Sequence, residues 1–222
     1  MRTEKNITFQ FKARYYTLGE LNQQTKQVWF VIHGYGQLAQ YFIKKFEVLA
    51  KQNIFVIAPE GLSRFYLEDV QTRAAGGSNR VGATWMTREN RLVDIENYIS
   101  YLDNIYSVEV QSKNPNIPIT ILGFSQGAAT ATRWILNEAI QFDQFVLWAG
   151  IFPTDMNFDK GHSLLADKKV VTVFGTDDPF ITPPRVQELN DLTKKIGIQP
   201  EKMSFNGKHE MNDELLLKLA GL

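Results

Sequence analysis

The hydrophobic pattern divides the chain into short apolar runs separated by longer amphipathic stretches. The apolar runs, which are typical of strands buried on both faces, occupy residues 27–34, 54–58, 119–123, 145–149 and 170–174. Helical spacing of apolar residues follows at 38–50, 89–106, 126–140, 183–196 and 212–219. This alternation predicts an α/β fold, a three-layer α/β/α sandwich around a mostly parallel twisted sheet with right-handed crossovers.

Two segments depart from this alternation. Apolar and polar residues alternate over residues 7–16, which predicts a half-buried, antiparallel strand at the N-terminal edge of the sheet. Residues 59–88 have no clean period and carry Gly76-Gly77-Ser78, so we expect a long loop with a hinge or tip there. No internal repeat, low-complexity tract or linker marks a second domain, so we expect residues 1–222 to form a single domain without a large lid.

Composition narrows the classes of partner. Lys plus Arg and Asp plus Glu number 24 each, so no excess charge favours nucleic acid. The chain has no cysteine, which excludes disulfides, thiolate zinc sites and a cysteine nucleophile. No apolar run approaches the roughly 18 residues that a membrane span needs. We therefore expect a cytoplasmic protein without integral membrane association, a monomer or homodimer, that acts on a small molecule.

A serine lies where a predicted strand turns directly into a predicted helix. Gly123-Phe124-Ser125-Gln126-Gly127 satisfies the pattern G-x-S-x-G, with an apolar run before it and a helical pattern after it. So sharp a turn needs small residues two positions on either side of the serine, and it points the hydroxyl beyond the carboxyl end of the strand. Taken alone, the pentapeptide is equally compatible with a serine that only caps the helix.

A serine nucleophile needs a nearby base and a carboxylate that orients the base. The histidines are His33, His162 and His209, and only His209 follows the apolar strands as the chain order serine, acid, histidine requires. Asp177 and Asp178 directly follow the run 170–174, so they leave the sheet at the same edge as the serine, and we choose Asp178 as the acid. The alternatives are an exposed loop histidine and aspartates that cap a helix or pair with a cation.

The tetrapeptide His33-Gly34-Tyr35-Gly36 ends the first buried run. Its glycines let the backbone turn an N–H group toward the serine. The N–H groups of Tyr35 and Gln126 would then form a two-donor oxyanion hole. The alternative is an ordinary glycine turn, and we expect His33 itself to be structural in either case.

These motifs together resemble one branch of a known superfamily. The segments HGYG, APEG (58–61), GFSQGA, GTDDPF and GKHE, in this order, resemble the carboxylesterase/phospholipase (acyl-protein thioesterase-like) branch of the α/β hydrolases. The resemblance implies the α/β-hydrolase fold and hydrolysis of carboxylic esters or thioesters without a metal or other cofactor. It assigns Ser125 as nucleophile, Asp178 as acid, His209 as base, and Tyr35 and Gln126 as oxyanion donors.

Two positions depart from that family, and both concern the substrate side of the site. Gln37 stands where the family often has Asp, and Trp85-Met86-Thr87 stands where it usually has Trp-Phe-Asp.

The substrate pocket is expected to be apolar. Its expected lining residues, all in loops near the carboxyl edge, are Phe65, Trp85, Met86, Phe180 and Ile181. Core packing is the alternative for such aromatic residues. The expected function is a serine hydrolase, acting as a carboxylesterase, lysophospholipase or thioesterase through an acyl-enzyme. An acyltransferase using the same intermediate and a non-catalytic binding module of this fold remain alternatives.

Overall fold

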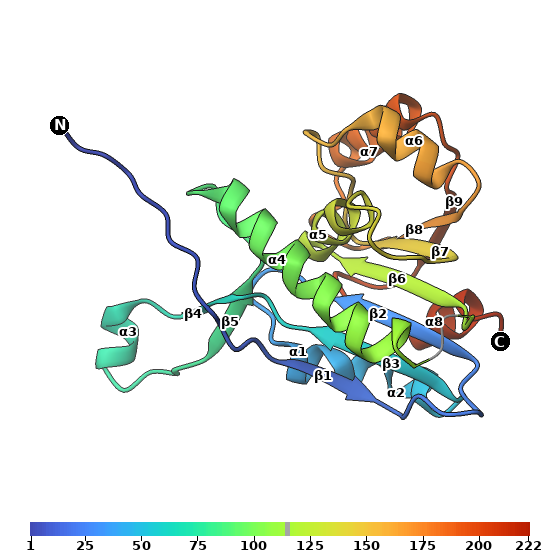
Figure 1. The fold of residues 1–222 in the computed structure, drawn as a ribbon, viewed down its shortest axis with the longest axis horizontal. Coiled ribbons are helices and arrows are strands. Elements are labelled where there is room, and N and C mark those ends of the chain that lie inside the picture. Colours follow the sequence, from blue (N-terminus) through green and yellow to red (C-terminus); the bar gives the residue numbers. More distant parts are fainter. Residues whose placement is uncertain (114–115) are drawn as a thin grey trace.

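A computed structural model describes residues 1–113 and 116–222 of the chain. A seven-stranded sheet with the order β1-β3-β2-β6-β7-β8-β9 forms the centre of this part (Figure 1). The strands are β1 (Tyr15–Leu18), β2 (Gln27–Ile32), β3 (Ile54–Pro59), β6 (Ile119–Phe124), β7 (Gln144–Trp148), β8 (Lys169–Gly175) and β9 (Glu201–Phe205). Only β1 is antiparallel to its neighbour. The predicted mostly parallel sheet with an antiparallel N-terminal edge is therefore confirmed.

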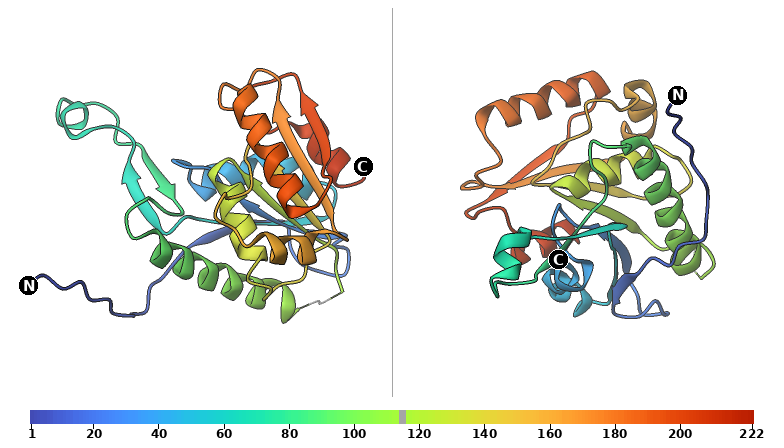
Figure 2. Two further views of the ribbon diagram at one scale, coloured as in Figure 1. Left: turned by 90° about the horizontal axis from the view of Figure 1, so that it is seen from above. Right: turned by 90° about the vertical axis from the view of Figure 1, so that its left-hand side faces the viewer.

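Helices cover both faces of the sheet, which explains why the strands are apolar on both sides (Figures 1 and 2). One face packs against α4 (Arg91–Tyr106), α5 (Gln126–Ile135), α6 (Phe158–Leu165) and α7 (Pro183–Ile196). The other packs against α1 (Ala39–Phe42), the 3₁₀ turn η1 (Ile43–Phe46), α2 (Glu47–Ala50) and α8 (Asp213–Leu219). A π-helical turn, η2 (Ser107–Gln111), continues α4.

The two faces have separate hydrophobic cores because successive residues of each strand point in opposite directions. Phe30 and Ile121 belong to the core under α4 and α5, whereas Trp29 and Leu122 belong to the core under α1 and α8. All four side chains are fully buried. The sheet is thus fixed from both sides, and its carboxyl edge is a rigid base for the loops that follow the strands.

The N-terminal strand prediction was wrong in its extent. Residues 7–14 form no strand, and β1 begins only at Tyr15. Tyr15 pairs with Pro59, the last residue of β3, so the preceding residues have no neighbouring strand to pair with. The segment before β1 instead leaves the sheet as an extended chain with exposed Ile7 and Phe9 (Figure 1).

The loop predicted at residues 59–88 is in part an ordered hairpin. Strands β4 (Ser63–Tyr66) and β5 (Val81–Thr84) pair antiparallel, and the short helix α3 (Val70–Ala74) lies at the tip. The hairpin projects from the body of the molecule (Figures 1 and 2). Its base joins the sheet's carboxyl edge, where a bridge pairs Gln37 with Ala83.

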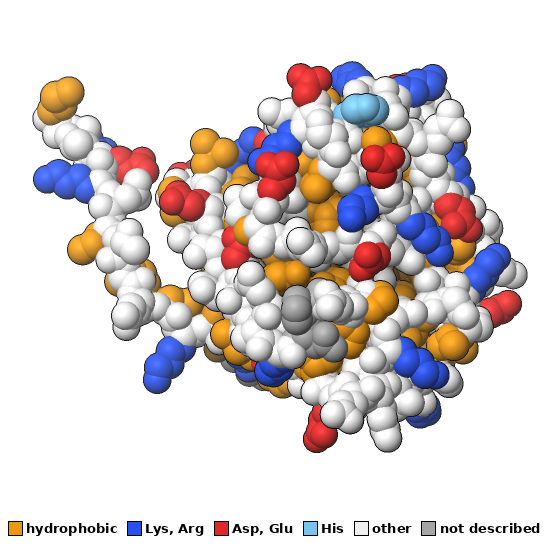
Figure 3. All heavy atoms as spheres, turned by 45° about the vertical axis from the view of Figure 1, so that its right-hand side comes forward, with side chains coloured by type: hydrophobic (Ala, Val, Ile, Leu, Met, Phe, Trp, Pro, Cys, Tyr) orange, Lys and Arg blue, Asp and Glu red, His pale blue; other side chains and the backbone are white. Residues whose placement is uncertain are grey.

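The surface carries no large field of one charge sign on the face shown in Figure 3, where acidic and basic side chains are interspersed. This matches the equal numbers of cationic and anionic residues. Across residues 1–113 and 116–222, every helix is too short or too polar to cross a bilayer.

Candidate active site

Ser125 occupies the turn between β6 and α5 with φ 55° and ψ −117°. A serine at positive φ is strained, and such strain persists only where the surrounding structure enforces it. A Cβ atom on Gly123 would lie 2.4 Å from the Gly127 oxygen, and one on Gly127 would lie 2.1 Å from the Ile32 oxygen. The predicted need for small residues on both sides of the serine is confirmed. The Ser125 N–H also donates to the Trp148 oxygen (2.9 Å), which fixes the turn to β7.

Asp178 and His209 come together at this edge of the sheet. Asp178 follows β8, His209 lies in the turn between β9 and α8, and His209 Nδ1 is 2.7 Å from Asp178 Oδ2. The Asp178 side chain is fully buried, and its Oδ1 accepts the Phe180 N–H (2.9 Å). A carboxylate held in this way fixes both the tautomer and the orientation of the imidazole.

The imidazole of His209 lies between two aromatic rings. The ring centroids of Phe124 and Phe180 are 4.7 Å and 4.8 Å from that of His209. Because Phe124 immediately precedes Ser125, this packing brings the histidine beside the serine's turn. Asp177, the alternative acid, is exposed; its N–H donates to the Gly207 oxygen (3.0 Å) and ties the two loops together.

The loop after β2 leaves one backbone donor free. The Gly34 N–H donates to Gln37 Oε1 (2.9 Å), and the Gln37 N–H donates to the Gly34 oxygen (3.3 Å). The Gly36 N–H donates to the β5 backbone at Ala83 (2.9 Å). Among the described residues, only the Tyr35 N–H of these four consecutive groups lacks an acceptor. The glutamine at position 37, which departs from the family pattern, closes the loop on itself.

This loop lies against the serine. A Cβ atom built on Gly34 would be 3.1 Å from Ser125 Cβ, so the loop backbone lies in close contact with the serine. Gln126 is the first residue of α5, and its N–H likewise has no acceptor in the described part of the chain. Two free N–H groups, of Tyr35 and Gln126, therefore flank the serine at the positively polarised end of a helix.

His33 orients the peptide that carries the Tyr35 N–H. The Gly61 N–H donates to His33 Nε2 (2.9 Å), so the ring proton is on Nδ1 and is donated to the Gly34 oxygen (2.7 Å). That carbonyl belongs to the same peptide unit as the Tyr35 N–H. Burial lowers the pKa of His33 to about 4, which keeps the ring neutral near pH 7. His33 is therefore a structural residue, as expected, and its two hydrogen bonds hold the loop that lies beside Ser125.

The side chain of Gln126 was missed as a contact by reasoning from the sequence, which considered only its backbone. Its Oε1 accepts from Thr84 Oγ1 (3.1 Å) and from the Trp85 N–H (3.3 Å), and its Nε2 donates to the Met86 oxygen (3.1 Å). The amide therefore connects the first turn of α5 to the segment that follows β5.

Two of the expected substrate residues lie at the rim of the site. The ring of Phe65 packs against that of Tyr35, with centroids 5.0 Å apart, and Tyr35 is 60% exposed. Phe180 is 65% exposed beside His209. These aromatic side chains present apolar surface to solvent on two sides of the Ser125 turn.

The other three expected substrate residues lie deeper. Trp85 is buried; its indole packs 5.0 Å from the His33 ring and donates to the His33 oxygen (2.9 Å). Met86 is partly buried, with its sulfur 3.8 Å from the Arg133 guanidinium. Ile181 is partly buried beside α7.

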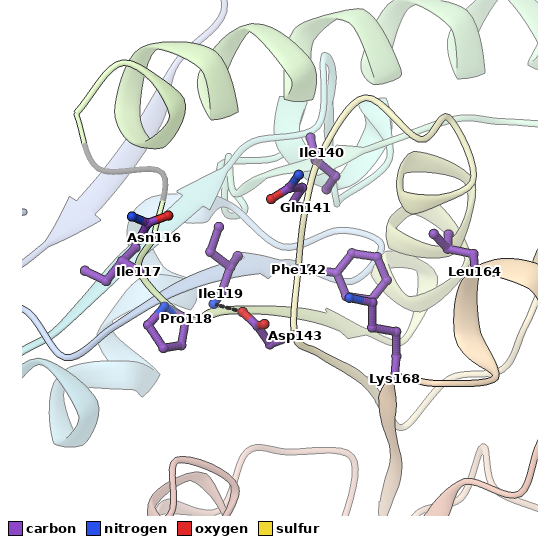
Figure 4. Close-up of a pocket in the computed structure, with 10 residues that line it drawn as sticks. All are labelled: Asn116, Ile117, Pro118, Ile119, Ile140, Gln141, Phe142, Asp143, Leu164 and Lys168. Carbon is purple, nitrogen blue, oxygen red and sulfur yellow. Dashed lines mark hydrogen bonds between the residues drawn. The ribbon is translucent and has the colours of Figure 1, made fainter.

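Two hollows are not lined by the residues of the proposed triad. One, of about 410 Å³, opens at the amino ends of β6 and β7, where Asp143 accepts the Ile119 N–H (Figure 4). The other, of about 830 Å³, lies between the N-terminal segment and α4 and is also lined by Trp85, one of the expected substrate residues. Neither is lined by Ser125, Asp178 or His209. Within the part of the chain that the structure describes, no three His, Asp or Glu side chains gather to hold a metal ion.

The mostly parallel sheet with helices on both faces has the architecture of the α/β-hydrolase fold, in agreement with a family model that matches residues 18–220. The chain belongs to the Phospholipase/Carboxylesterase family, whose model matches residues 18–220. This membership supports esterase activity in general.

Solved structures of low sequence identity share the fold. Acyl-protein thioesterase 2 of Zea mays is 16% identical with a TM-score of 0.66, and the match covers 95% of this chain and 97% of that one. Carboxylesterases of Mesorhizobium loti and Bacillus cereus are each 18% identical, with TM-scores of 0.68 and 0.64. They cover 94% of this chain, and 94% and 92% of their own. No curated protein matches the chain significantly.

Proposed function

We propose that this protein is a serine esterase that cleaves carboxylic esters through an acyl-enzyme on Ser125. The observation that carries the proposal is the hydrogen bond between His209 Nδ1 and the buried Asp178, formed beside the strained Ser125 turn. The family membership supports the same reaction class. The two free N–H groups next to the serine supply the remaining requirement, a place for a negative oxygen.

In the first half of the reaction, Ser125 Oγ attacks the ester carbonyl carbon while His209 Nε2 takes the hydroxyl proton. Asp178 holds the opposite ring nitrogen and stabilises the imidazolium that forms. The carbonyl oxygen becomes negative and accepts hydrogen bonds from the N–H groups of Tyr35 and Gln126. His209 then gives its proton to the leaving alcohol or thiol, and the C–O or C–S bond breaks to leave the acyl-enzyme.

In the second half, water replaces the leaving group. His209 removes a proton from the water molecule, the new tetrahedral intermediate uses the same two N–H groups, and collapse returns the proton to Ser125. No residue beyond this constellation is needed to balance the reaction, so hydrolysis requires only the ester and water.

The rim favours substrates with an apolar group next to the reacting carbonyl. Tyr35 with Phe65 on one side and Phe180 on the other are exposed aromatic side chains. Apolar surface of this kind binds alkyl or aryl groups by excluding water. We therefore propose small-molecule esters with such a group as substrates, and thioesters are included because the attack and the oxyanion are the same.

Hydrolysis of p-nitrophenyl esters of increasing acyl length tests the proposal, with Ser125→Ala as the decisive variant. We expect kcat/KM to fall by about four orders of magnitude, because the members of a triad act as a unit. Ser163→Ala is the matched control: this exposed hydroxyl bonds only the Asp159 oxygen on α6, and activity should be unchanged. Hydrolysis that survives in folded Ser125→Ala would show that another group is the nucleophile.

A further inference from the structure

The turn after β3 contains a buried carboxylate that the proposed mechanism does not use. The Glu60 side chain is 1% exposed, and Arg14 donates to its two oxygens at 2.7 Å and 3.2 Å. Arg64 donates to Oε1 at 2.9 Å, and the backbone N–H of Ala39 donates to Oε2 at 3.1 Å. Burial alone would raise the pKa of Glu60, but these bonds outweigh it and the pKa is lowered. The carboxylate is therefore ionised and fully bonded.

Glu60 and Gly61 together hold both ends of the loop that presents the Tyr35 N–H. At the start of the loop, the Gly61 N–H bonds His33 Nε2; at its end, the Glu60 carboxylate bonds the Ala39 N–H, the first residue of α1. The turn that contains Gly61 packs directly against β5, because a Cβ atom on Gly61 would lie 2.6 Å from the Thr84 oxygen. This close packing holds Glu60 and Gly61 in place.

We infer that Glu60 is a positioning residue for the proposed oxyanion hole, and this inference rests on the proposed function. Tyr35 lies between the two fixed ends, two residues after His33 and four before Ala39. Donors stabilise a transition state only when they are held within about 0.5 Å of the productive geometry. Release of Ala39 frees the C-terminal end of the loop and lets the Tyr35 N–H turn away from the reacting oxygen.

The ion pairs of Glu60 suggest a competing explanation, in which the carboxylate only secures the fold. Arg14 precedes β1, and Arg64 lies on β4 of the hairpin, so Glu60 also joins two peripheral segments to the sheet. The two explanations differ in what they predict for turnover per folded molecule. A purely structural role lowers stability and leaves kcat unchanged, whereas a positioning role lowers kcat.

The first variant is Glu60→Gln, which keeps the size of the side chain but has one acceptor oxygen in place of two. If that oxygen faces the two arginines, the NH2 group faces the Ala39 N–H, and the contact to the loop is lost. With active sites counted by fluorophosphonate titration, we expect kcat to fall about 10- to 100-fold and KM to change less than about threefold, because the lost contact acts on the transition state. Affinity for a trifluoromethyl ketone, which forms the same oxyanion, should fall by a similar factor. Glu68→Gln is the matched control, because Glu68 pairs with Arg80 (2.6 Å) on the hairpin without contacting the loop; its kcat should stay at the wild-type value.

A second variant removes the other partner of the contact. Ala39→Pro deletes the N–H that Glu60 accepts, at a first helical position where proline is tolerated. The preceding residue, Leu38, has φ −112° and ψ 138°, which suits a residue before proline. We expect the same loss of kcat, and no further loss when both substitutions are combined, because they break one contact. If Glu60→Gln does not fold, Ala39→Pro decides.

The outcomes separate the inference from the proposed function. Unchanged kcat and ketone affinity per active site in a folded variant would overturn the positioning role, even if stability falls. A wild-type protein without Ser125-dependent hydrolysis would overturn the proposed function and the inference with it, and this is measured before any variant. Loss of kcat in both variants, with Glu68→Gln unaffected, supports both.

Discussion

At the scale of single residues, hydrogen bonds and close packing hold two residues of the candidate site, Ser125 and His33, in one conformation. Ser125 is strained, and the glycines around it and the bond to Trp148 keep it so. His33 is neutral and bonded through both ring nitrogens. Both features hold the backbone around the serine in one conformation, which is the condition that the proposed oxyanion hole needs for strong stabilisation of a negative oxygen.

The burial of His33 has a consequence for stability against pH. Its pKa is lowered from 6.5 in the unfolded chain to about 4 in the folded protein, so the unfolded state binds the proton more tightly. The resulting stability is fully present above pH 6.5 and is lost as the pH falls toward 4. Between pH 7 and pH 5 we expect His33 to account for a decrease of about 2 kcal/mol in the free energy of unfolding.

Urea unfolding of the wild type and of His33→Gln at several pH values measures this contribution. Glutamine does not titrate, so the variant should lose about 2 kcal/mol less than the wild type between pH 7 and pH 5, whatever its stability at pH 7. The control is His162→Gln, at the histidine on α6 that is not fully buried. Identical pH dependence in the wild type and His33→Gln would contradict a neutral, buried ring.

At the scale of elements, the helix that begins at the serine is braced to the base of the hairpin. Gln126 bonds residues of the segment 84–86 through both ends of its amide. The same segment contains Trp85, whose indole bonds the His33 oxygen. Helix α5, the end of β5 and the loop after β2 therefore form one connected support around Ser125.

Gln126→Ala removes this brace while it keeps the backbone N–H. We expect the free energy of unfolding to fall by about 2 kcal/mol and kcat/KM to fall far less than in Ser125→Ala, because the donor itself remains. Thermal and urea unfolding together with ester hydrolysis measure both effects. Gln187→Ala, which removes an exposed amide bonded to Asp191 on α7, should change neither. A loss of activity as large as that of Ser125→Ala, with intact folding, would argue against a backbone role.

The hydrophobic pattern predicts the central strands well because burial determines which of their positions are apolar. Every buried strand was recognised, since strands covered on both faces are almost wholly apolar. Helix α5 ends at Ile135 rather than at residue 140, and α6 was not recognised because it is short and has few buried residues. The hairpin was missed because β4 and β5 have mixed, mostly exposed or small residues whose pairing depends on contacts with the loop after β2.

The same limit applies to the candidate site. Chain order and strand ends singled out Asp178 and His209, and the structure brings their side chains together. The contacts of Glu60 and of the Gln126 amide come from loops that are distant in sequence, so no local pattern reveals them. A signal for Glu60 did exist in its position, because a lone carboxylate directly after a wholly buried strand needs partners.

At the scale of the whole molecule, the sheet brings the candidate site residues to one edge, although in the sequence they are spread from Tyr35 to His209. The loops after β2, β6 and β8 and the turn after β9 all leave from this edge. Because six of the seven strands run parallel, these four connections meet, and a rigid two-sided core holds them at fixed separations. The proposed chemistry follows from this topology together with the residues at its edge.

Covalent labelling with a fluorophosphonate, followed by intact mass analysis and peptide mapping, tests most directly whether Ser125 is an activated nucleophile. We expect one adduct per chain, located on Ser125, and no adduct in Ser125→Ala or His209→Ala, because the hydroxyl reacts only when the imidazole takes its proton. An adduct on a different serine, or a folded wild-type protein that takes no label, would contradict it.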